Sequence, residues 1–326
     1  MAKSYEFKEV KRDKGNILIT GGAGYLGSVM TGHFLESGYN VTCLDNLSFS
    51  QKSLMIYAHN PKFDFIYGDV RDQGLVKRVI KDKDVIIPLA ARVGMPLCDR
   101  NPQDAREINE EAVDNLNYFR SPEQKILYPN TNSGYGARTG EVFCTEDTPL
   151  QPISLYGKTK CKAEKDLLEG TKDALTFRLA TVFGVSPRMR TDLLVNDFVL
   201  KAVQDRSLVL FESSFKRNYI HIRDVARAFE HGIENYETMK NKPYNLGLDD
   251  ANLSKLELAQ KIKKYVPGLE ILEAPIGKDP DKRNYIVSNK RLLDTGFKPA
   301  YSLDDGIVEL LKAYEILLKN NLYGNV

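Results

Sequence analysis

The sequence predicts an α/β protein, with a doubly wound parallel sheet followed by a smaller C-terminal α/β domain. Apolar strand patterns alternate with stretches of helical period through the first half of the chain, and this alternation stops near residue 180. Continuous apolar strands separated by helices are typical of a parallel sheet that is covered on both faces. We therefore expect a charged leader at residues 1–14, a first domain at residues 15–180 and a second domain at residues 181–326.

The first domain carries a series of strand patterns. They cover residues 16–20, 41–45, 63–69, 84–90, 125–131 and 174–180. Residues 25–37 follow the first strand with helical period. Beyond residue 180 the strands are shorter, and Ser254 and Ser302 can each cap a helix. The smaller domain is expected at the carboxyl edge of the sheet, where open α/β sheets bind their ligands.

The composition argues against several classes of protein. The 326 residues carry 46 Lys and Arg against 44 Asp and Glu, a net charge of +2, so no overall field attracts nucleic acid or an anionic membrane. The charged start predicts no secretory signal, and no apolar run reaches about 18 residues, so we expect a cytoplasmic protein. The 4 cysteines form no CxxC pair, and together with 4 histidines they predict no metal site.

A glycine-rich turn joins the first predicted strand to the first helix. Residues 21–27 read GGAGYLG, and their glycines let the backbone approach a pyrophosphate whose charge lies at the helix N-terminus. Asp45 ends the second strand, 18 residues after Gly27, where its carboxylate can accept hydrogen bonds from both ribose hydroxyls of an adenosine. A 2′-phosphate would meet like charge there. The pattern therefore predicts NAD rather than NADP.

Tyr156 and Lys160 are four residues apart, on one face of a helix that is expected to start near Ser154. A phenol with a pKa of about 10 is a poor base at pH 7. A neighbouring ammonium and the positive nicotinamide ring favour the phenolate and lower that pKa. Tyr156 can then take the proton of a substrate hydroxyl while a hydride leaves the same carbon. We therefore predict an oxidation that depends on this pair.

These motifs together resemble those of the extended short-chain dehydrogenase/reductase family, in its nucleotide-sugar epimerase and dehydratase group, over residues 15–315. Residues 20–27 look like the glycine signature of that family, and Tyr156 with Lys160 looks like its catalytic pair. The resemblance implies a Rossmann sheet, NAD as the cofactor, and Thr131 as a third catalytic residue that bonds the reacting oxygen. It implies that NAD is bound by Gly21, Gly24, Tyr25, Leu26, Gly27, Asp45, Asn46, Asp69, Val70, Leu89, Ala90, Ala91, Tyr156 and Lys160.

The resemblance also implies a nucleotide-sugar substrate, whose diphosphate should be held by arginines of the second domain. Arg217 and Arg283 match arginines that clamp phosphates in the family, and Arg188 and Arg190 lie where its substrate loop runs. Each of these could instead be a solvated surface arginine. The residues expected to bind the substrate are Val93, Asn132, Ser133, Arg188, Asn196, Arg217 and Arg283.

Three further expectations follow from the same resemblance. Asn109 matches an asparagine that orders the site, with a helix surface as the alternative. The loop at residues 92–101 departs from the common family pattern and could shape the sugar pocket through Val93 and Cys98. Family members usually pair through two helices, here residues 102–119 and 154–169, so we expect a homodimer.

Asn132 and Ser133 decide between chemistries of the family. In 4,6-dehydratases these positions resemble an Asp-Glu pair, which protonates the leaving hydroxyl and removes a ring proton. Neither an amide nor an aliphatic hydroxyl titrates usefully near neutral pH, so elimination of water lacks its proton carriers. Deprotonation of a ring carbon is disfavoured for the same reason. The remaining reaction is reversible oxidation at C4.

Oxidation at C4 has two outcomes. In a 4-dehydrogenase the keto sugar leaves, and in a 4-epimerase it turns over in the site and takes the hydride back on its other face. Residues 180–198, 216–224 and 279–285 resemble proteins of capsular heptose pathways, which favours a GDP-D-glycero-D-manno-heptose 4-dehydrogenase. A third alternative is an NAD-binding sensor without catalysis, although such proteins typically lose the tyrosine or the lysine.

Overall fold

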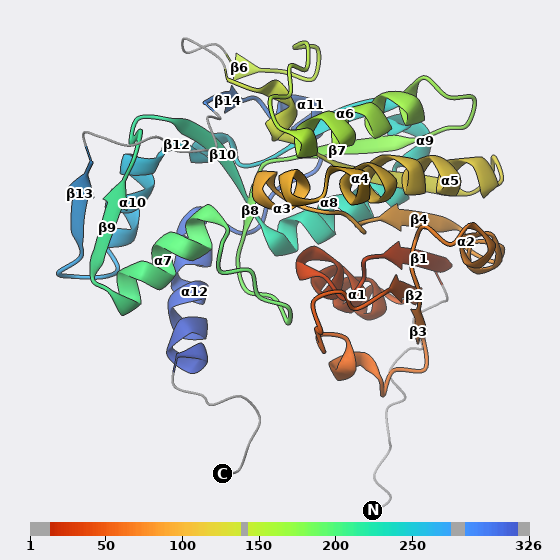
Figure 1. Ribbon diagram of the computed structural model, residues 1–326, viewed down its shortest axis with the longest axis horizontal. Helices are drawn as coiled ribbons and strands as arrows, with labels where there is room; N and C mark the ends of the chain where they lie inside the picture. Colours follow the sequence, from red (N-terminus) through yellow and green to blue (C-terminus); the bar gives the residue numbers. More distant parts are fainter. Residues whose placement is uncertain (1–13, 138–142, 275–283, 319–326) are drawn as a thin grey trace, which may run out of the picture.

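Seven parallel strands form the main sheet of the computed structural model, which describes residues 14–137, 143–274 and 284–318 (Figure 1). Their order across the sheet is β11-β7-β5-β4-β1-β2-β3. They are β1 (Asn16–Thr20), β2 (Asn40–Asp45), β3 (Phe63–Tyr67), β4 (Val85–Pro88), β5 (Lys125–Thr131), β7 (Leu175–Leu179) and β11 (Lys242–Leu246). Each strand predicted in the first domain is confirmed to within two residues at either end, and so is the doubly wound α/β fold class.

Helices cover both faces of this sheet. On one face lie α1 (Tyr25–Ser37), α8 (Ile222–Glu234) and α9 (Tyr236–Met239), and on the other α2 (Gln73–Val79), α5 (Ala112–Phe119) and α6 (Leu155–Leu168). Successive side chains of a strand point to opposite faces. In β1, Ile17 and Ile19 therefore join the core beneath α1 and α8, whereas Leu18 joins the core beneath α2, α5 and α6. Burial on both faces explains why the strands are almost continuously apolar.

The strand order reverses at β1 and β4, which are neighbours at the centre of the sheet. The connections that follow these two strands run in opposite directions, so a crevice opens at their carboxyl ends. The glycine-rich turn at residues 21–27 follows β1, and Leu89 follows β4. The fold thus brings both predicted cofactor segments to the crevice.

Strand β11 and helix α8 return the chain to the main sheet after residue 180. Residues 242–246 pair in parallel with β7, and α8 packs against α1 and β5. The predicted division into residues 15–180 and 181–326 assigns β11 and α8 to the second domain, whereas the structure places both against the main sheet. Strand pairing is a long-range property, and a short apolar pattern such as that of β11 does not reveal which sheet it joins.

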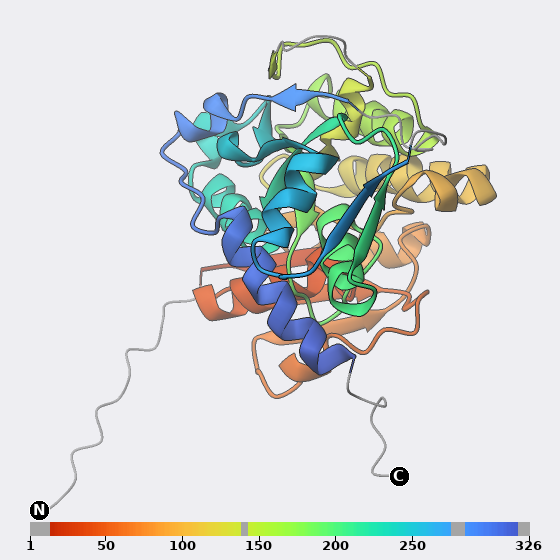
Figure 2. The same ribbon diagram turned by 90° about the vertical axis from the view of Figure 1, so that its left-hand side faces the viewer.

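The second lobe, as we call the smaller unit, lies beside the main sheet (Figure 1). It contains α7 (Leu194–Gln204), α10 (Lys255–Lys263), α12 (Leu303–Leu317), a sheet of β8 (Thr181–Phe183), β10 (Lys216–His221) and β12 (Asn252–Ser254), and the pair β9 (Ser207–Leu210) and β13 (Glu270–Glu273). Helix α7 packs against both α10 and α12, and α12 is the dark blue helix that crosses the view in Figure 2. Ser254 and Ser302 cap α10 and α12 as predicted, each within a capping box.

Shorter elements connect these units. They are α3 (Met95–Arg100), α4 (Pro102–Arg106), a π-helical turn (Glu107–Glu111), 3-10 turns at Met55–Tyr57, Asn132–Tyr135 and Asp249–Ala251, α11 (Lys290–Leu293), and the strand pair β6 (Phe143–Cys144) and β14 (Ile286–Val287). Within the described ranges, the helices are all too short or too polar to span a membrane.

Candidate active site

A cavity of about 830 Å³ lies between the main sheet and the second lobe, at the carboxyl ends of the strands. It brings together most of the residues predicted to bind cofactor or substrate. Those that line it are Gly21, Gly24, Tyr25, Leu26, Gly27, Asp45, Asn46, Asp69, Val70, Leu89, Ala90, Ala91, Val93, Thr131, Ser133, Tyr156, Lys160, Arg188 and Arg217. Asn132 and Asn196 are not among the lining residues, and Arg283 lies outside the described part of the chain.

The glycine-rich turn is built for close approach. Gly21 has a φ of 72°, and a Cβ on it would lie 2.6 Å from the backbone nitrogen of Ala90. A Cβ on Gly27 would lie 2.4 Å from the carbonyl oxygen of Gly21. Helix α1 starts at Tyr25, within this turn, and Gly24 at its N-cap supplies no side-chain hydrogen bond. The first amides of α1 can therefore bind an anion at the cavity wall, which fits the pyrophosphate of a dinucleotide.

Asp45 ends β2 with a buried carboxylate that two backbone amides hold in place. Its Oδ2 accepts a hydrogen bond from the amide of Ala23 at 3.0 Å, and its Oδ1 accepts one from the amide of Leu47 at 2.8 Å. Burial raises the pKa of Asp45, and the two amide bonds oppose that rise. Oδ1 also accepts from Gln51 Nε2 at 3.2 Å, whereas the second lone pair of Oδ2 can still accept from a ribose hydroxyl.

Asp69 faces the same end of the cavity within a fixed ion pair. Arg71 donates to both of its carboxylate oxygens, at 2.9 and 2.8 Å, and the Asn46 amide donates to Oδ2 at 2.9 Å. These hydrogen bonds from Arg71 hold the pKa of Asp69 well below its usual range. The Asp69 carboxylate is therefore held in place at the cavity wall by Arg71 and Asn46.

Helix α6 carries both Tyr156 and Lys160 to the cavity. Ser154 caps this helix by accepting a hydrogen bond from the amide of Gly157 at 3.1 Å, so α6 begins at Leu155 as the sequence predicts. The Lys160 side chain is buried, and its Nζ lies 4.0 Å from the centroid of the Tyr128 ring. Burial lowers the pKa of Lys160 to about 7, against the opposing charges of Cys161 and Glu164.

The buried Lys160 predicts a pH-dependent stability. Its pKa is depressed in the folded state, so the unfolded chain binds more protons between about pH 7 and pH 10.5. The cost of burying the charge is full below pH 7 and is relieved as the pH rises through this window. Between these pH values, the free energy of unfolding of the wild type should rise relative to that of Lys160→Met by up to about 1.4 kcal/mol per pH unit, measured by urea unfolding. Lys158→Met, at an exposed position of the same helix, should show no such trend. If the stability difference between the wild type and Lys160→Met were the same at pH 6 and pH 10, the burial argument would be contradicted.

Thr131 and Ser133 form a hydroxyl pair on the cavity wall. Thr131 ends β5, and its Oγ1 donates to Ser133 Oγ at 3.0 Å and accepts from the Ser133 amide at 3.1 Å. Asn132 begins the 3-10 turn that follows β5, is buried, and is not among the residues that line the cavity. Its expected contact with substrate stays a prediction. Within the described residues, neither polar atom of its amide has a hydrogen-bond partner.

Asn196 is also absent from the lining of the cavity. It lies in the first turn of α7 and is fully buried, with its Nδ2 donating to the carbonyl of Arg190 at 2.8 Å and to the hydroxyl of Tyr25 at 3.2 Å. Its Oδ1 accepts from the amide of Gly184 at 3.1 Å, and Tyr25 donates to the carbonyl of Gly184 at 2.7 Å. Asn196 therefore joins the second lobe to the glycine-rich turn, and its expected contact with substrate stays a prediction.

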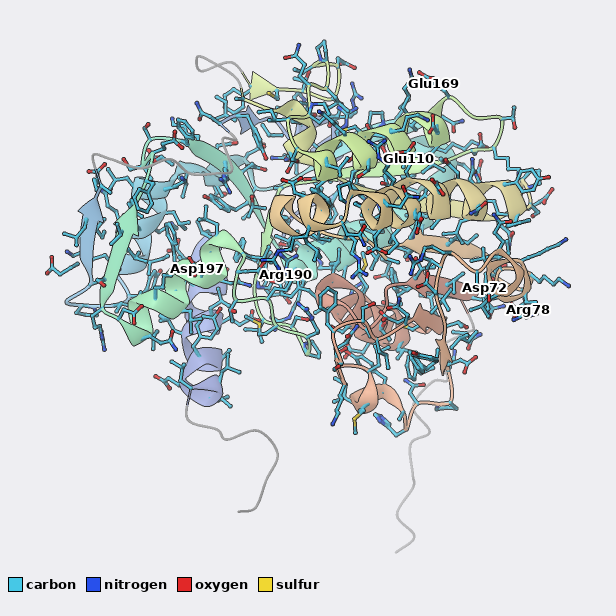
Figure 3. All side chains as sticks on the ribbon, viewed as in Figure 1. Asp72, Arg78, Glu110, Glu169, Arg190 and Asp197 are labelled. Carbon is cyan, nitrogen blue, oxygen red and sulfur yellow. The ribbon has the colours of Figure 1, made fainter. Side chains whose placement is uncertain are left out.

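The predicted arginines have different surroundings. Arg217 is buried in β10 and reaches the cavity from the second lobe. Arg190 lies in the segment between β8 and α7 and also lines the cavity. It forms an ion pair with Asp192, and Figure 3 labels it together with Asp197 of α7. Arg188 lines the same cavity, and its expected contact with substrate stays a prediction. Its guanidinium carbon lies 5.0 Å from the centroid of the Phe49 ring, close to Asp45.

Asn109 lies inside a π-helical turn and is buried, which decides against a helix surface. Its Oδ1 accepts from the amide of Arg92 at 2.8 Å, and its Nδ2 donates to the carbonyl of Arg92 at 3.0 Å and to Thr159 at 3.2 Å. It thus fixes the start of the loop at residues 92–101 against α6. This agrees with the expected ordering of the site.

Sequence reasoning missed Thr181, which lines the cavity from β8. Its hydroxyl is buried and has no hydrogen-bond partner among the described residues, so it is available to a ligand. The signal was its position just after the predicted strand at residues 174–180, because polar residues at carboxyl strand ends face the ligand crevice.

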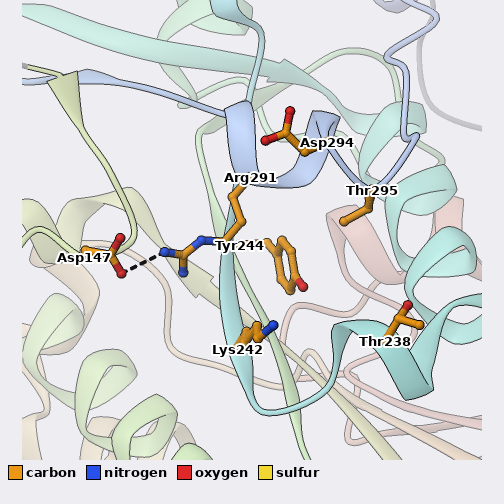
Figure 4. Close-up of a pocket in the computed structure, with 7 residues that line it drawn as sticks. All are labelled: Asp147, Thr238, Lys242, Tyr244, Arg291, Asp294 and Thr295. Atoms are coloured by element: carbon orange, nitrogen blue, oxygen red, sulfur yellow. Dashed lines mark hydrogen bonds and ion pairs between the residues drawn. The ribbon is translucent and has the colours of Figure 1, made fainter.

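A second hollow, of about 540 Å³, lies at the edge strand β11 (Figure 4). Arg291 projects into it and donates to Asp147 at 2.7 Å, so its charge is already paired. The hollow contains none of the predicted site residues that the structure describes. The candidate site is therefore the larger cavity beside the glycine-rich turn.

The comparison with known families decides the identity of this site. A model described as the NAD dependent epimerase/dehydratase family matches residues 17–247, well over half of the chain. The chain belongs to this family. NAD is accordingly its cofactor, and the residues of the glycine-rich turn and Asp45 fit that group. The chain is an enzyme of the NAD-dependent epimerase/dehydratase type.

Individual members of the family match along nearly the whole chain. The low-salt glycan biosynthesis protein Agl12 of Haloferax volcanii is 28% identical over 319 residues, which are 92% of this chain and 98% of that protein. A UDP-glucose 4-epimerase of Lactobacillus helveticus is 26% identical over 318 residues, 90% of this chain and 94% of that protein. The structure of UDP-glucose 4-epimerase from Thermotoga maritima with UDP-glucose has the same fold, with a TM-score of 0.80 at 24% identity, covering 93% of this chain and 100% of that chain.

Proposed function

We propose that this family member is a nucleotide-sugar 4-epimerase, which oxidises its substrate at C4 and returns the hydride to the opposite face. The observation that carries the proposal is the convergence of Tyr156, Lys160 and the Thr131–Ser133 hydroxyl pair on one cavity with the cofactor turn. Two of the relatives described above are named as UDP-glucose 4-epimerases, which supports internal return of the hydride.

In this proposal, some residues transfer the proton and others bind the substrate. NAD, when bound, accepts a hydride from the sugar carbon. Tyr156, as a phenolate favoured by the ammonium form of Lys160, takes the proton of the C4 hydroxyl and gives it back when the carbonyl is reduced. The Thr131–Ser133 pair supplies a hydrogen bond to the same oxygen as charge develops on it. Arg217, and Arg283 as predicted from sequence, would bind the diphosphate.

The residues after β5 argue against elimination of water. Asn132 is a buried amide, and Ser133 is an alcohol paired with Thr131. Neither is an acid or a base near neutral pH, so the proton transfers that a 4,6-dehydratase needs have no carrier at these positions. The proposal is therefore confined to oxidation and reduction at C4.

A second candidate is net dehydrogenation at C4 of GDP-D-glycero-D-manno-heptose in capsule biosynthesis. The segments at residues 180–198 and 216–224 favour it by their resemblance to heptose-pathway proteins. None of the relatives named above carries that substrate in its name. We further propose that the enzyme acts in the cytoplasm as a homodimer formed through the helices at residues 102–119 and 154–169.

The test is to incubate the purified protein with NAD and a panel of UDP-, CDP- and GDP-sugars in D₂O. The proposal expects the C4 epimer of one substrate by proton NMR, with all ring hydrogens retained and no accumulation of reduced nicotinamide. Stoichiometric reduced nicotinamide together with a keto sugar would instead establish the dehydrogenase. Deuterium at C3 or C5 of the product would contradict both, because it requires deprotonation of a ring carbon.

A further inference from the structure

Arg188 is contributed by the segment between β8 and α7, yet it lies on the cofactor side of the cavity. Its guanidinium carbon is 5.0 Å from the centroid of the Phe49 ring, and Phe49 belongs to the loop that follows Asp45. Arg188 and Asp45 both line the cavity, and the ring under the guanidinium belongs to the residue four positions after Asp45. This part lies at the end of β2, where the carboxylate is placed to accept from the adenosine ribose.

The backbone of Arg188 is tied to the cofactor-binding helix. Its amide donates to Ser186 Oγ at 3.2 Å, and Ser186 Oγ donates to the carbonyl of Tyr25 at 2.7 Å and lies 3.0 Å from Ser28 Oγ. Tyr25 and Ser28 belong to the first turn of α1. The position of Arg188 is therefore fixed relative to the glycine-rich turn.

Among the residues that the structure describes, the guanidinium of Arg188 has no carboxylate partner. Within the described ranges no acidic oxygen lies in ion-pair distance of it, and its side chain donates only a long hydrogen bond of 3.4 Å, to the carbonyl of Met189. Burial and the neighbouring Arg190 lower the pKa of Arg188, whereas Asp192 and Asp45 raise it. Arg190, two residues later, is paired with Asp192. A half-buried guanidinium stacked on a ring and lining a cavity is suited to bind an anion with several donors at once.

We propose that Arg188 is a ligand of the adenosine half of NAD, at its ribose and the adjoining phosphate, and that it holds the cofactor in place from the second lobe. The guanidinium would cover this half of NAD opposite the glycine-rich turn, so that release requires the segment at residues 184–192 to move. The inference depends on the cofactor and not on which sugar is oxidised, so it stands or fails separately from the proposed 4-epimerase activity. Retention of NAD would suit an enzyme that returns the hydride.

The test compares Arg188→Met with Arg190→Met, a change to the ion-paired arginine of the same segment. Binding is measured by calorimetry on the full chain, with NAD, with ADP-ribose and with nicotinamide mononucleotide. Arg188→Met should lower the affinity for NAD and for ADP-ribose by about 10-fold, because a charge-assisted contact is lost. It should leave the affinity for the mononucleotide unchanged. It should also raise the rate at which NAD dissociates. Arg190→Met should change the affinity for NAD by less than about 2-fold.

Phe49→Leu provides a second variant, which keeps the charge and removes the ring beneath it. It should lower the affinity for ADP-ribose by a smaller factor without changing the affinity for UDP or GDP. This variant keeps the proposal testable if Arg188→Met fails to fold. The proposal is overturned if Arg188→Met leaves ADP-ribose affinity intact while weakening UDP or GDP in the presence of saturating NAD. Equal losses of NAD affinity in Arg188→Met and Arg190→Met would also overturn the proposal, because such losses would indicate a general disturbance of the segment.

Discussion

Replacing Tyr156 by phenylalanine should lower turnover by a factor of about 10² to 10⁴, the range over which a positioned acid–base group accelerates proton transfer. The ring that lines the cavity is kept, so only the hydroxyl is lost. NAD should therefore still bind with nearly native affinity, because the glycine-rich turn and Asp45 are untouched. The measurement is turnover on the nucleotide sugar that the wild type accepts, alongside calorimetry with NAD.

Tyr67→Phe is the matched control, since Tyr67 is 71% exposed on the edge strand β3 and far along the sheet from α6. It should leave turnover unchanged. If Tyr156→Phe turned over at the wild-type rate, the hydroxyl could not be the group that accepts the sugar proton. Some other base would then have to be sought among the residues that line the cavity.

The second large effect is expected at a buried ion pair behind the catalytic helix. Glu164 lies one turn after Lys160 on α6, and Arg178 of β7 donates to its Oε1 through Nε at 2.9 Å and through a terminal nitrogen at 2.7 Å. Arg178 also donates to the hydroxyl of Tyr135 at 3.1 Å and to the carbonyl of Glu146 at 2.9 Å. Both charged side chains are almost inaccessible to solvent.

Arg178→Met should lower the free energy of unfolding by about 3–5 kcal/mol, because it leaves the Glu164 carboxylate buried without its partner. The measurement is the urea midpoint at pH 7. The double variant Glu164→Leu/Arg178→Met should recover part of this loss, since no lone charge is then buried. Recovery should be incomplete, because Tyr135 and the Glu146 carbonyl still lose a donor.

A surface ion pair serves as the comparison. Lys290 and Asp294 are both well exposed, and their Nζ and Oδ1 are 2.7 Å apart. Lys290→Met should cost no more than about 0.5 kcal/mol. If Arg178→Met were equally mild, the pair behind α6 would have to be accessible to water in solution, contrary to its burial in the structure.

The parts of the site that follow from local geometry could be predicted from the sequence. The turn at residues 21–27 needs only a strand, a few glycines and a helix start, and all of these lie within a dozen residues. Tyr156 and Lys160 share a helical face because of their spacing alone. Asp45 could be placed because a strand end determines where its side chain points. Each of these residues lines the cavity.

The parts that depend on long-range packing could not be predicted. Asn196 of α7 donates to Tyr25, a contact between segments that are far apart in sequence. Asn132 is buried at the start of a short 3-10 turn, which residue spacing does not reveal. Arg188 required knowledge of how the two lobes meet, because its neighbour Phe49 is far from it in sequence.

The position of β11 at the edge of the main sheet has a consequence for biosynthesis. Chains emerge from the ribosome N-terminus first, so β7 is released long before residues 242–246 can pair with it. Until then its apolar residues, such as Phe177, present an unpaired strand edge on which nascent chains tend to associate. Cofactor added during translation would therefore encounter a chain whose main sheet still lacks β11. A fragment that stops near residue 180 should be insoluble when expressed alone.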